Sequence, residues 1–127
     1  MSATDLGLGD LESSVLEDAW YELEGAFEVY SIGRCRFVLV HCRTAMLISI
    51  VILAKRRGLP FLDGGIDLLG RRLGMPEQIL ESCGAIDQAG RYESILNTRS
   101  DEQEKAETIL SKTLEAFEWI RGEMGTG

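Results

Sequence analysis

Apolar residues recur every three or four positions over two long segments, one near each end of the chain, which is the spacing of amphipathic helices. The stripe of the first segment consists of Leu11, Val15, Leu16, Ala19, Leu23, Ala26, Phe27 and Tyr30. The stripe of the second consists of Ala106, Ile109, Leu110, Thr113, Leu114, Phe117, Ile120 and Met124. Asp10 is the expected N-cap of the first helix, and Gly33 marks the break after it. Ser100 and Gln103 have the spacing of a capping box, which predicts the start of the last helix.

The segment Phe37–Ala54 is almost continuously apolar and reads FVLVHCRTAMLISIVILA. No turn signal interrupts it, so its length predicts a helix over about 34–57, closed by Gly58 and then Pro60. Its β-branched centre is also compatible with a strand. The segment approaches the length of a short membrane span, but Arg43 is costly in a bilayer, and a helix apolar on all sides is equally typical of a soluble core. We therefore expect no membrane insertion.

Small and bulky residues divide the surface of this central helix. The mostly small residues recur every seven positions and are Cys35, Val38, Cys42, Ala45, Ser49 and Ile52. Such a stripe lets another helix approach closely. The bulky residues Leu39, Leu47, Ile50 and Leu53 lie elsewhere on the helix. Together they offer more apolar surface than one short bundle covers, which predicts a homodimer.

The remaining helical signals are shorter. Ile66, Leu68, Leu69 and Leu73 predict a short helix that ends at Gly74. Pro76 suits the first position of the next helix, which runs toward Gly90, and residues 90–99 are expected to be irregular. The expected fold is therefore all-α: an up-and-down four-helix bundle with one additional short helix. At 127 residues, the chain has the size of a single domain, spanning 1–127.

Charge is distributed unevenly. The net formal charge is -8, but residues 1–32 hold eight acidic and no basic residues, whereas residues 33–74 hold eight basic and two acidic ones. The acidic total argues against non-specific binding to nucleic acid. A site for an anionic ligand would therefore draw on the middle third, unless its arginines simply pair with the neighbouring acidic helices.

The sequence excludes several kinds of chemistry. Its three cysteines contain no CxxC pair and His41 is the only histidine, so we expect no zinc site, no other metal and no cofactor. Phosphate-loop and dinucleotide glycine motifs are absent. His41 directly precedes Cys42 on a helix, so the two side chains cannot face each other, and His41 is expected to be a core or interface residue. The acidic N-terminal segment and the cysteine usage indicate a reducing, cytoplasmic location.

The order of three segments resembles the HEPN family, the "higher eukaryotes and prokaryotes nucleotide-binding" helical domains. The segments are FVLVHCRTAMLISIVILAKRRGLPF, IDLLGRRLG and GRYESILNTRSDEQEKAETILSKTLEAFEWI. The resemblance covers nearly the whole chain. It implies a four- or five-helix bundle that forms a symmetric dimer and often pairs with a nucleotidyltransferase as toxin and antitoxin.

Many HEPN proteins cleave RNA without a metal, using an arginine followed after four to six residues by a histidine. The resemblance places Arg91 at the arginine, but Leu96, Asn97 and Thr98 occupy the positions open to the histidine. The Thr-His pair that usually precedes the third-helix Asp-Leu is also replaced, by glycines and Ile66. A proton-transferring imidazole is therefore missing from the family motif, which favours a non-catalytic protein.

Five residues are candidates for a ligand site: Arg91, Tyr92, Arg99, Arg56 and Arg57. A guanidinium binds phosphate in a fork, and a phenol ring stacks on a nucleobase. The expected function is binding of a nucleotide, RNA or a nucleotidyltransferase partner in one cleft. Three alternatives stay open: a metal-independent ribonuclease, a structural interaction subunit, and a purely structural site in which Arg91 pairs with acids of the terminal helix and Tyr92 packs under the loop.

Overall fold

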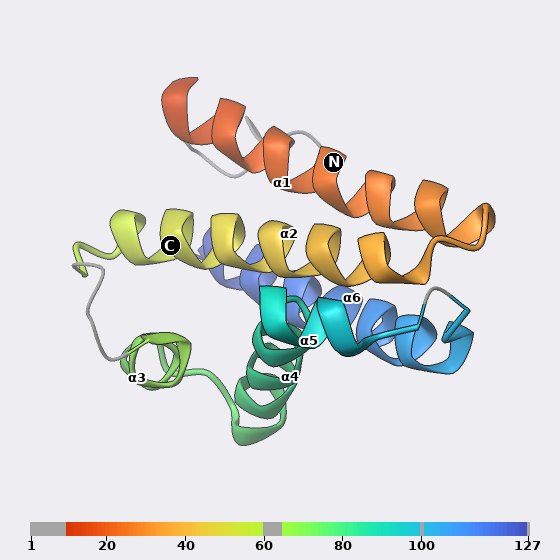
Figure 1. Ribbon diagram of the computed structural model, residues 1–127. Coiled ribbons are helices and arrows are strands. Elements are labelled where there is room, and N and C mark those ends of the chain that lie inside the picture. The colour runs from red at the N-terminus through yellow and green to blue at the C-terminus, as the bar shows by residue number, and fades with distance from the viewer. Residues whose placement is uncertain (1–9, 60–64, 100, 127) are drawn as a thin grey trace.

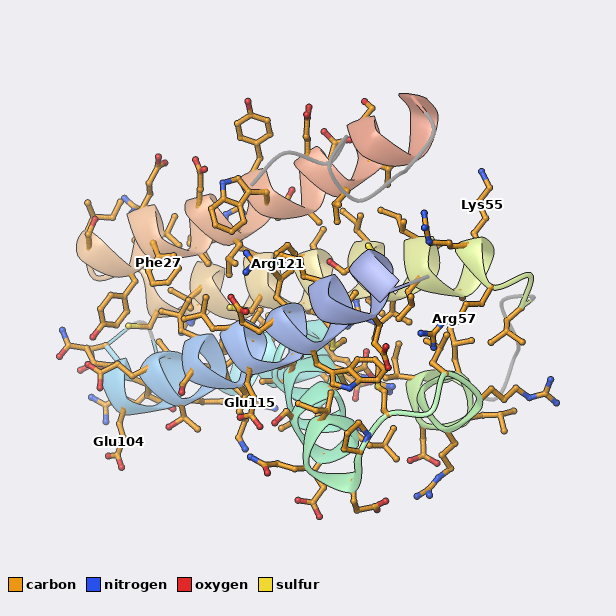
Figure 2. The ribbon with its side chains drawn as sticks, turned by 180° about the vertical axis from the view of Figure 1, so that it is seen from behind. Phe27, Lys55, Arg57, Glu104, Glu115 and Arg121 are labelled. Carbon is orange, nitrogen blue, oxygen red and sulfur yellow. The ribbon has the colours of Figure 1, made fainter. Side chains whose placement is uncertain are left out.

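The computed structural model describes residues 10–59, 65–99 and 101–126, and these residues form six helices (Figure 1). The helices are α1 (Asp10–Ser31), α2 (Cys35–Arg56), α3 (Gly65–Arg72), α4 (Glu77–Ala89), α5 (Tyr92–Asn97) and α6 (Gln103–Thr126). The all-α prediction is confirmed for this part of the chain. The long helices α1, α2 and α6 run roughly along one another, while α4 runs steeply across their direction (Figure 1 and Figure 2).

Glycines in the left-handed backbone region end the first two helices, as the sequence predicts. Gly33 has a φ of 78°, and beyond it the amide of Arg34 donates to the carbonyl of Val29 at 2.9 Å. Gly58 has a φ of 70°, and the amide of Leu59 donates to the carbonyl of Ala54 at 2.9 Å. In both cases a positive φ lets the chain turn while its amides satisfy carbonyls at the helix end.

The central helix α2 packs against α1, α4 and α6, and its small side chains are used inside the protomer. All six residues of the predicted small stripe are buried: Cys35, Val38, Cys42, Ala45, Ser49 and Ile52. The hydroxyl of Ser49 donates to the carbonyl of Ala45 at 2.8 Å, so this buried polar group is satisfied within its own helix. The stripe therefore serves the packing of helices within one chain.

Two residues assigned to apolar stripes are exposed instead. Phe27 is 44% exposed on α1, and Leu114 is 40% exposed on α6. The reason is that α1 rests mainly on α2 and touches α6 at few places, one of which joins the rings of Trp20 and Phe117 at 5.9 Å. The apolar stripes of α1 and α6 are thus wider than the surfaces that neighbouring helices cover.

The segment between α4 and α6 differs most from prediction. Residues 90–99 were expected to be irregular, but Tyr92–Asn97 form α5, a helix of six residues with none buried. Because no side chain of α5 reaches the core, the sequence carries no apolar periodicity there. Ser100 lies outside the described residues. The last helix begins at Gln103, three residues after the expected cap, and the amide of Arg99 donates to Oε1 of Glu102 at 3.0 Å.

By length and composition, α2 could cross a membrane, with a mean hydropathy of 2.2 over an 18-residue window. However, 56% of that window is buried inside the protein. A soluble core helix has the same properties.

Candidate functional site

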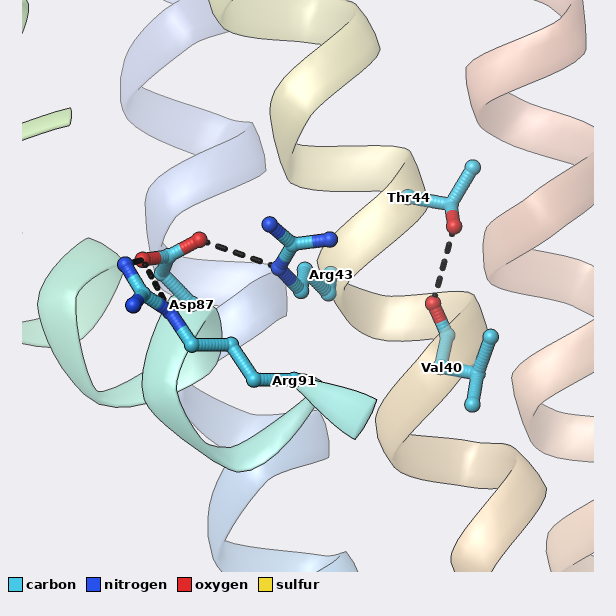
Figure 3. Close-up of polar contacts among 5 residues, drawn as sticks. All are labelled: Val40, Arg43, Thr44, Asp87 and Arg91. Carbon is cyan, nitrogen blue, oxygen red and sulfur yellow. Dashed lines mark hydrogen bonds and ion pairs between the residues drawn. The ribbon is translucent and has the colours of Figure 1, made fainter. Parts of the chain in front are cut away.

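Asp87 on α4 joins two arginines that are far apart in sequence (Figure 3). Its Oδ1 accepts from Nε of Arg43 on α2 at 3.0 Å. Its Oδ2 accepts from Nε and Nη2 of Arg91 at 3.2 and 2.7 Å. The side chain of Asp87 is only 10% exposed, so water screens these contacts weakly. Asp87 therefore holds two guanidinium groups side by side at the protein surface.

A glycine brings these residues together. Gly90 follows α4 directly, and a β-carbon at this position would lie 2.4 Å from Cβ of Arg43 and 2.7 Å from the carbonyl oxygen of Leu39. Any larger residue would collide with α2. The end of α4 consequently touches the backbone of α2, and Arg91, the next residue, emerges beside Arg43.

A third arginine lies on the same side of α2. Arg36 precedes Arg43 by seven residues, which is two helical turns or about 10 Å along the axis. Its Nε donates to the carbonyl of the buried Thr98. Lys105 of α6 donates to Oγ1 of Thr98 at 2.8 Å, and that hydroxyl donates to the carbonyl of Ser94 at 2.7 Å. Thr98 thus fixes the loop after α5 against α2 and α6.

We call Arg36, Arg43 and Arg91 the arginine edge. Asp87 neutralises only one of the two guanidinium groups that it contacts, so the edge remains positive. The hydrogen bond from Arg43 to Asp87 uses Nε and not the two terminal nitrogens of the guanidinium (Figure 3). A planar guanidinium fixed in this way presents its remaining donors to an anion with little loss of conformational entropy.

Of the five predicted site residues, Arg91 belongs to this edge and Tyr92 follows it directly in the chain. Tyr92 is 76% exposed, and Arg91, which lies between α4 and α5, pairs with Asp87 of α4. The alternative in which Arg91 pairs with the terminal helix and Tyr92 packs under the loop is therefore wrong in both details. Arg99 follows the same loop, is exposed, and pairs with Asp101 at 3.2 Å.

The other two predicted residues, Arg56 and Arg57, lie at the far end of α2. Arg56 follows Arg43 by thirteen residues, or about 20 Å along the helix. Arg57 donates to the carbonyl of Leu73 at 2.9 Å and pairs with Glu123 of α6 at 3.3 Å, near α3 in Figure 2. The structure therefore separates the five candidates into two groups, because the groups lie toward opposite ends of α2 and are too far apart to line a single cleft.

His41 lies on another side of α2, between α2 and α1. Its Nδ1 is 2.6 Å from Oε2 of Glu22, and its ring packs on Gly25, where an added β-carbon would lie 3.3 Å from Cε1. His41 is thus a half-buried residue at a helix contact, as expected from the sequence. It does not approach Arg91.

The cysteines are buried and free. Burial raises the pKa of the Cys42 thiol to about 11 and that of the Cys83 thiol to about 12, which keeps both protonated and poorly nucleophilic at neutral pH. Among residues 10–59, 65–99 and 101–126, no group of three or more His, Cys, Asp or Glu side chains is placed to hold a metal.

A hollow of about 620 Å³ opens along the first turns of α6. Its polar lining includes Asp101, Glu102 and Glu104, so it does not suit an anion. None of the five predicted residues lines it.

Sequence reasoning missed Asp87 and Gly90. The first carries a readable signal, because Asp87 and Arg91 are four residues apart, the spacing at which opposite charges meet on a helix. The pair forms even though α4 ends at Ala89, two residues before Arg91. From the sequence, Gly90 indicates only the end of a helix, since its contact with α2 depends on the tertiary fold.

Comparisons with protein family models, with curated proteins and with solved structures return no match to this chain.

Proposed function

We propose that this protein is a non-catalytic helical protein of the HEPN type that binds phosphate groups of a nucleotide or of single-stranded RNA at the arginine edge. The observation that carries the proposal is the sharing of one nearly buried carboxylate, Asp87, between Arg43 and Arg91. Donors that are fixed before the ligand arrives lose little entropy on binding. The residues of this edge come from α2 and from the turn between α4 and α5, which only the folded protein brings together.

Tyr92 adds a second element of recognition. Its exposed ring follows Arg91 directly, and an exposed aromatic ring beside arginines is the arrangement that stacks a base while cations hold its phosphate. The 10 Å between Arg36 and Arg43 suits an extended ligand with more than one phosphate better than a single phosphate ion.

The positions of titratable groups support binding without cleavage. The single histidine of the sequence pairs with Glu22 at the contact of α1 and α2. Both carboxylate oxygens of Asp87 accept hydrogen bonds from arginines, which leaves this side chain poorly placed to take a proton from a substrate. Ribonuclease activity would need another proton donor and acceptor beside Arg91.

Other parts of the proposal rest on the resemblance to HEPN domains. They are the four-helix arrangement with an additional short helix, and a nucleotidyltransferase as a protein partner. Free, buried thiols suit a reducing, cytoplasmic location. A structural interaction subunit is a second candidate function, and the exposed side of α2 favours it.

The test is binding of a fluorescein-labelled single-stranded RNA, followed by anisotropy, with ATP, AMP and inorganic phosphate as competitors. Arg91→Gln removes a charged donor, which is worth roughly 1.5–3 kcal/mol, so we expect affinity to fall at least about tenfold. Tyr92→Ala is expected to weaken RNA and ATP but not inorganic phosphate. Arg71→Gln is the matched control, because Arg71 also pairs with an acid four residues away, Asp67.

The salt dependence gives an independent measurement. Losing one phosphate contact lowers the slope of log affinity against log salt by about 0.7 for single-stranded nucleic acid. Equal affinity in wild type, Arg91→Gln and Arg71→Gln would exclude the arginine edge as the site. Cleavage of the RNA by wild type, abolished in Arg91→Gln, would establish the ribonuclease alternative instead.

A further inference from the structure

Two side-chain contacts join α1 to α6. The rings of Trp20 on α1 and Phe117 on α6 have their centroids 5.9 Å apart, and the hydroxyl of Tyr30 on α1 donates to Oε1 of Glu107 on α6. From the first contact to the second, residue numbers rise along α1 and fall along α6, so the two helices run antiparallel. Ten residues separate the contacts on each helix, which is about 15 Å along its axis.

Phe27 and Leu114 lie between these two contacts. Phe27 follows Trp20 by seven residues and precedes Tyr30 by three, which places it on the side of α1 that faces α6. Leu114 has the same spacing from the two contact residues of α6, so it lies on the side that faces α1. Figure 2 views the molecule from this side and shows Phe27 between the two helices. We call the resulting apolar surface the interhelix patch, which consists of Trp20, Phe27, Leu114 and Phe117.

The interhelix patch is open to solvent although its side chains are large and apolar. Trp20 is 46% exposed, Phe27 is 44% exposed and Leu114 is 40% exposed, while Phe117 is buried beneath them. These exposed side chains come from two neighbouring helices and lie within about 15 Å of helix length, so they form one surface. A contiguous exposed apolar surface of this kind marks an interaction site.

Acidic residues border the patch on both helices. Their charge is opposed by little on α1, whose sequence contains no lysine or arginine. On α6, Arg121 lies beside the patch and pairs with Glu118 at 3.3 Å. The acidic residues within one helical turn of a patch residue include Glu17, Glu24, Glu28 and Glu118, all of which are exposed.

We propose that the interhelix patch binds a basic amphipathic helix of another protein. The apolar side of such a helix packs on the patch, and lysines or arginines on its flanks reach the glutamates of α1 and α6. The 15 Å between the two contacts corresponds to about three turns of the bound helix. Charge excludes a second copy of this chain as the better partner, because α1 would then meet acidic residues with acidic residues. The patch contains no residue of the arginine edge, so this binding is additional to binding of phosphate groups.

The first experiment measures binding of a designed helix to the full chain by fluorescence anisotropy. The labelled peptide has about 14 residues of leucine, lysine and alanine, with leucines at positions i, i+3, i+4 and i+7 on one side. A second peptide has the same composition in scrambled order, and a third has glutamate in place of lysine. We expect micromolar binding of the first peptide alone. No binding of the first peptide, or equal binding of the scrambled one, would overturn the proposal.

Variants of the full chain locate the binding surface. Phe27→Gln and Leu114→Gln should each weaken binding at least about fivefold, since each removes a central apolar contact. Val51→Gln is the matched control, because Val51 is a 42% exposed apolar residue on α2. Equal losses in Leu114→Gln and Val51→Gln would overturn the assignment. Circular dichroism and thermal melting verify that each variant is folded.

Charge reversal tests the acidic border separately. Glu24→Lys should weaken the peptide several-fold, whereas Glu81→Lys, at an exposed position of α4, changes the net charge equally and should have a smaller effect. Equal effects of the two variants would show attraction to net charge alone and contradict the proposal. RNA binding should persist in Leu114→Gln, and peptide binding should persist in Arg91→Gln, so failure of this surface and failure of the phosphate site are distinguishable.

Photocrosslinking places the peptide without altering the protein. A benzophenone side chain at a central leucine of the peptide should attach to residues within 20–28 and 110–118, identified by mass spectrometry after proteolysis. Attachment confined to other segments would refute the assignment. Sedimentation velocity of the chain alone covers the remaining occupant, because self-association that Leu114→Gln abolishes would assign the patch to a second copy instead.

Discussion

The contact between Gly90 and α2 can be tested with a single methyl group. In Gly90→Ala, the new β-carbon would lie 2.4 Å from Cβ of Arg43 and 2.7 Å from the carbonyl oxygen of Leu39. The oxygen belongs to the backbone of a buried helix turn and cannot rotate away. The backbone of Gly90 itself tolerates alanine, because its φ is -87° and its ψ is 1°. The whole penalty is therefore steric.

The magnitude follows from two opposing effects. Overpacking of this kind costs roughly 1–3 kcal/mol. Replacing glycine with alanine recovers about 0.4–1 kcal/mol by restricting the unfolded chain. We expect a net loss of about 1–2 kcal/mol, or on the order of 4–10 °C in the melting temperature of a domain this size.

Urea and thermal unfolding followed by circular dichroism measure the effect. Gly84→Ala is the internal control, because Gly84 lies within the same helix and a β-carbon there meets nothing within 4 Å. This control should gain up to about 1 kcal/mol, since alanine favours a helix. If Gly90→Ala were as stable as Gly84→Ala, the close approach of α4 to α2 would be refuted.

Two further perturbations test the electrostatics of the fold. Asp87→Asn removes the charge that Arg43 and Arg91 share, and because both arginines are partly exposed to water, it should cost about 1–3 kcal/mol in urea unfolding. The exposed Asp67→Asn should cost less than about 0.5 kcal/mol, and equal effects of the two substitutions would contradict the difference in burial between the two carboxylates. Burial raises the pKa of Cys42 and Cys83 above the ordinary thiol value of 9.0, so the unfolded chain loses these protons first as the pH rises. The free energy of unfolding should therefore be unaffected by these thiols below pH 9 and fall from pH 9 through about 11, more steeply in wild type than in Cys83→Ala; parallel pH profiles would argue against burial as the cause.

The order of the long helices along the chain was largely predictable from its apolar periodicity. The bounds of α1 and α2 follow from Gly33 and Gly58, which are strong local signals. The helix α5 was missed because it buries nothing, and periodicity detects only helices that face a core. Phe27 was placed on the buried stripe because periodicity reports the direction of a side chain, whereas burial also needs a neighbouring helix to cover it.

The candidate site was predictable only in part. Arg91 and Tyr92 were found, but grouping them with Arg57 assumed a proximity that the 20 Å of helix between the two groups rules out. Joining Arg91 to Arg43 requires knowing that α4 ends against α2, and that depends on the absence of a side chain at Gly90. The sequence shows that residue 90 is a glycine, but it does not show that a β-carbon at this position would collide with α2.

The shared carboxylate of Asp87 has a consequence for how this surface can change during evolution. If either Arg43 or Arg91 drifts to a neutral residue, Asp87 keeps one partner, so each arginine can be lost singly while the fold persists. If Asp87 is lost first, both arginines lose their partner together. The tolerance of the three positions to substitution is therefore asymmetric. Arg43 and Arg91 can each be replaced singly, whereas Asp87 can be replaced only after both arginines have been lost.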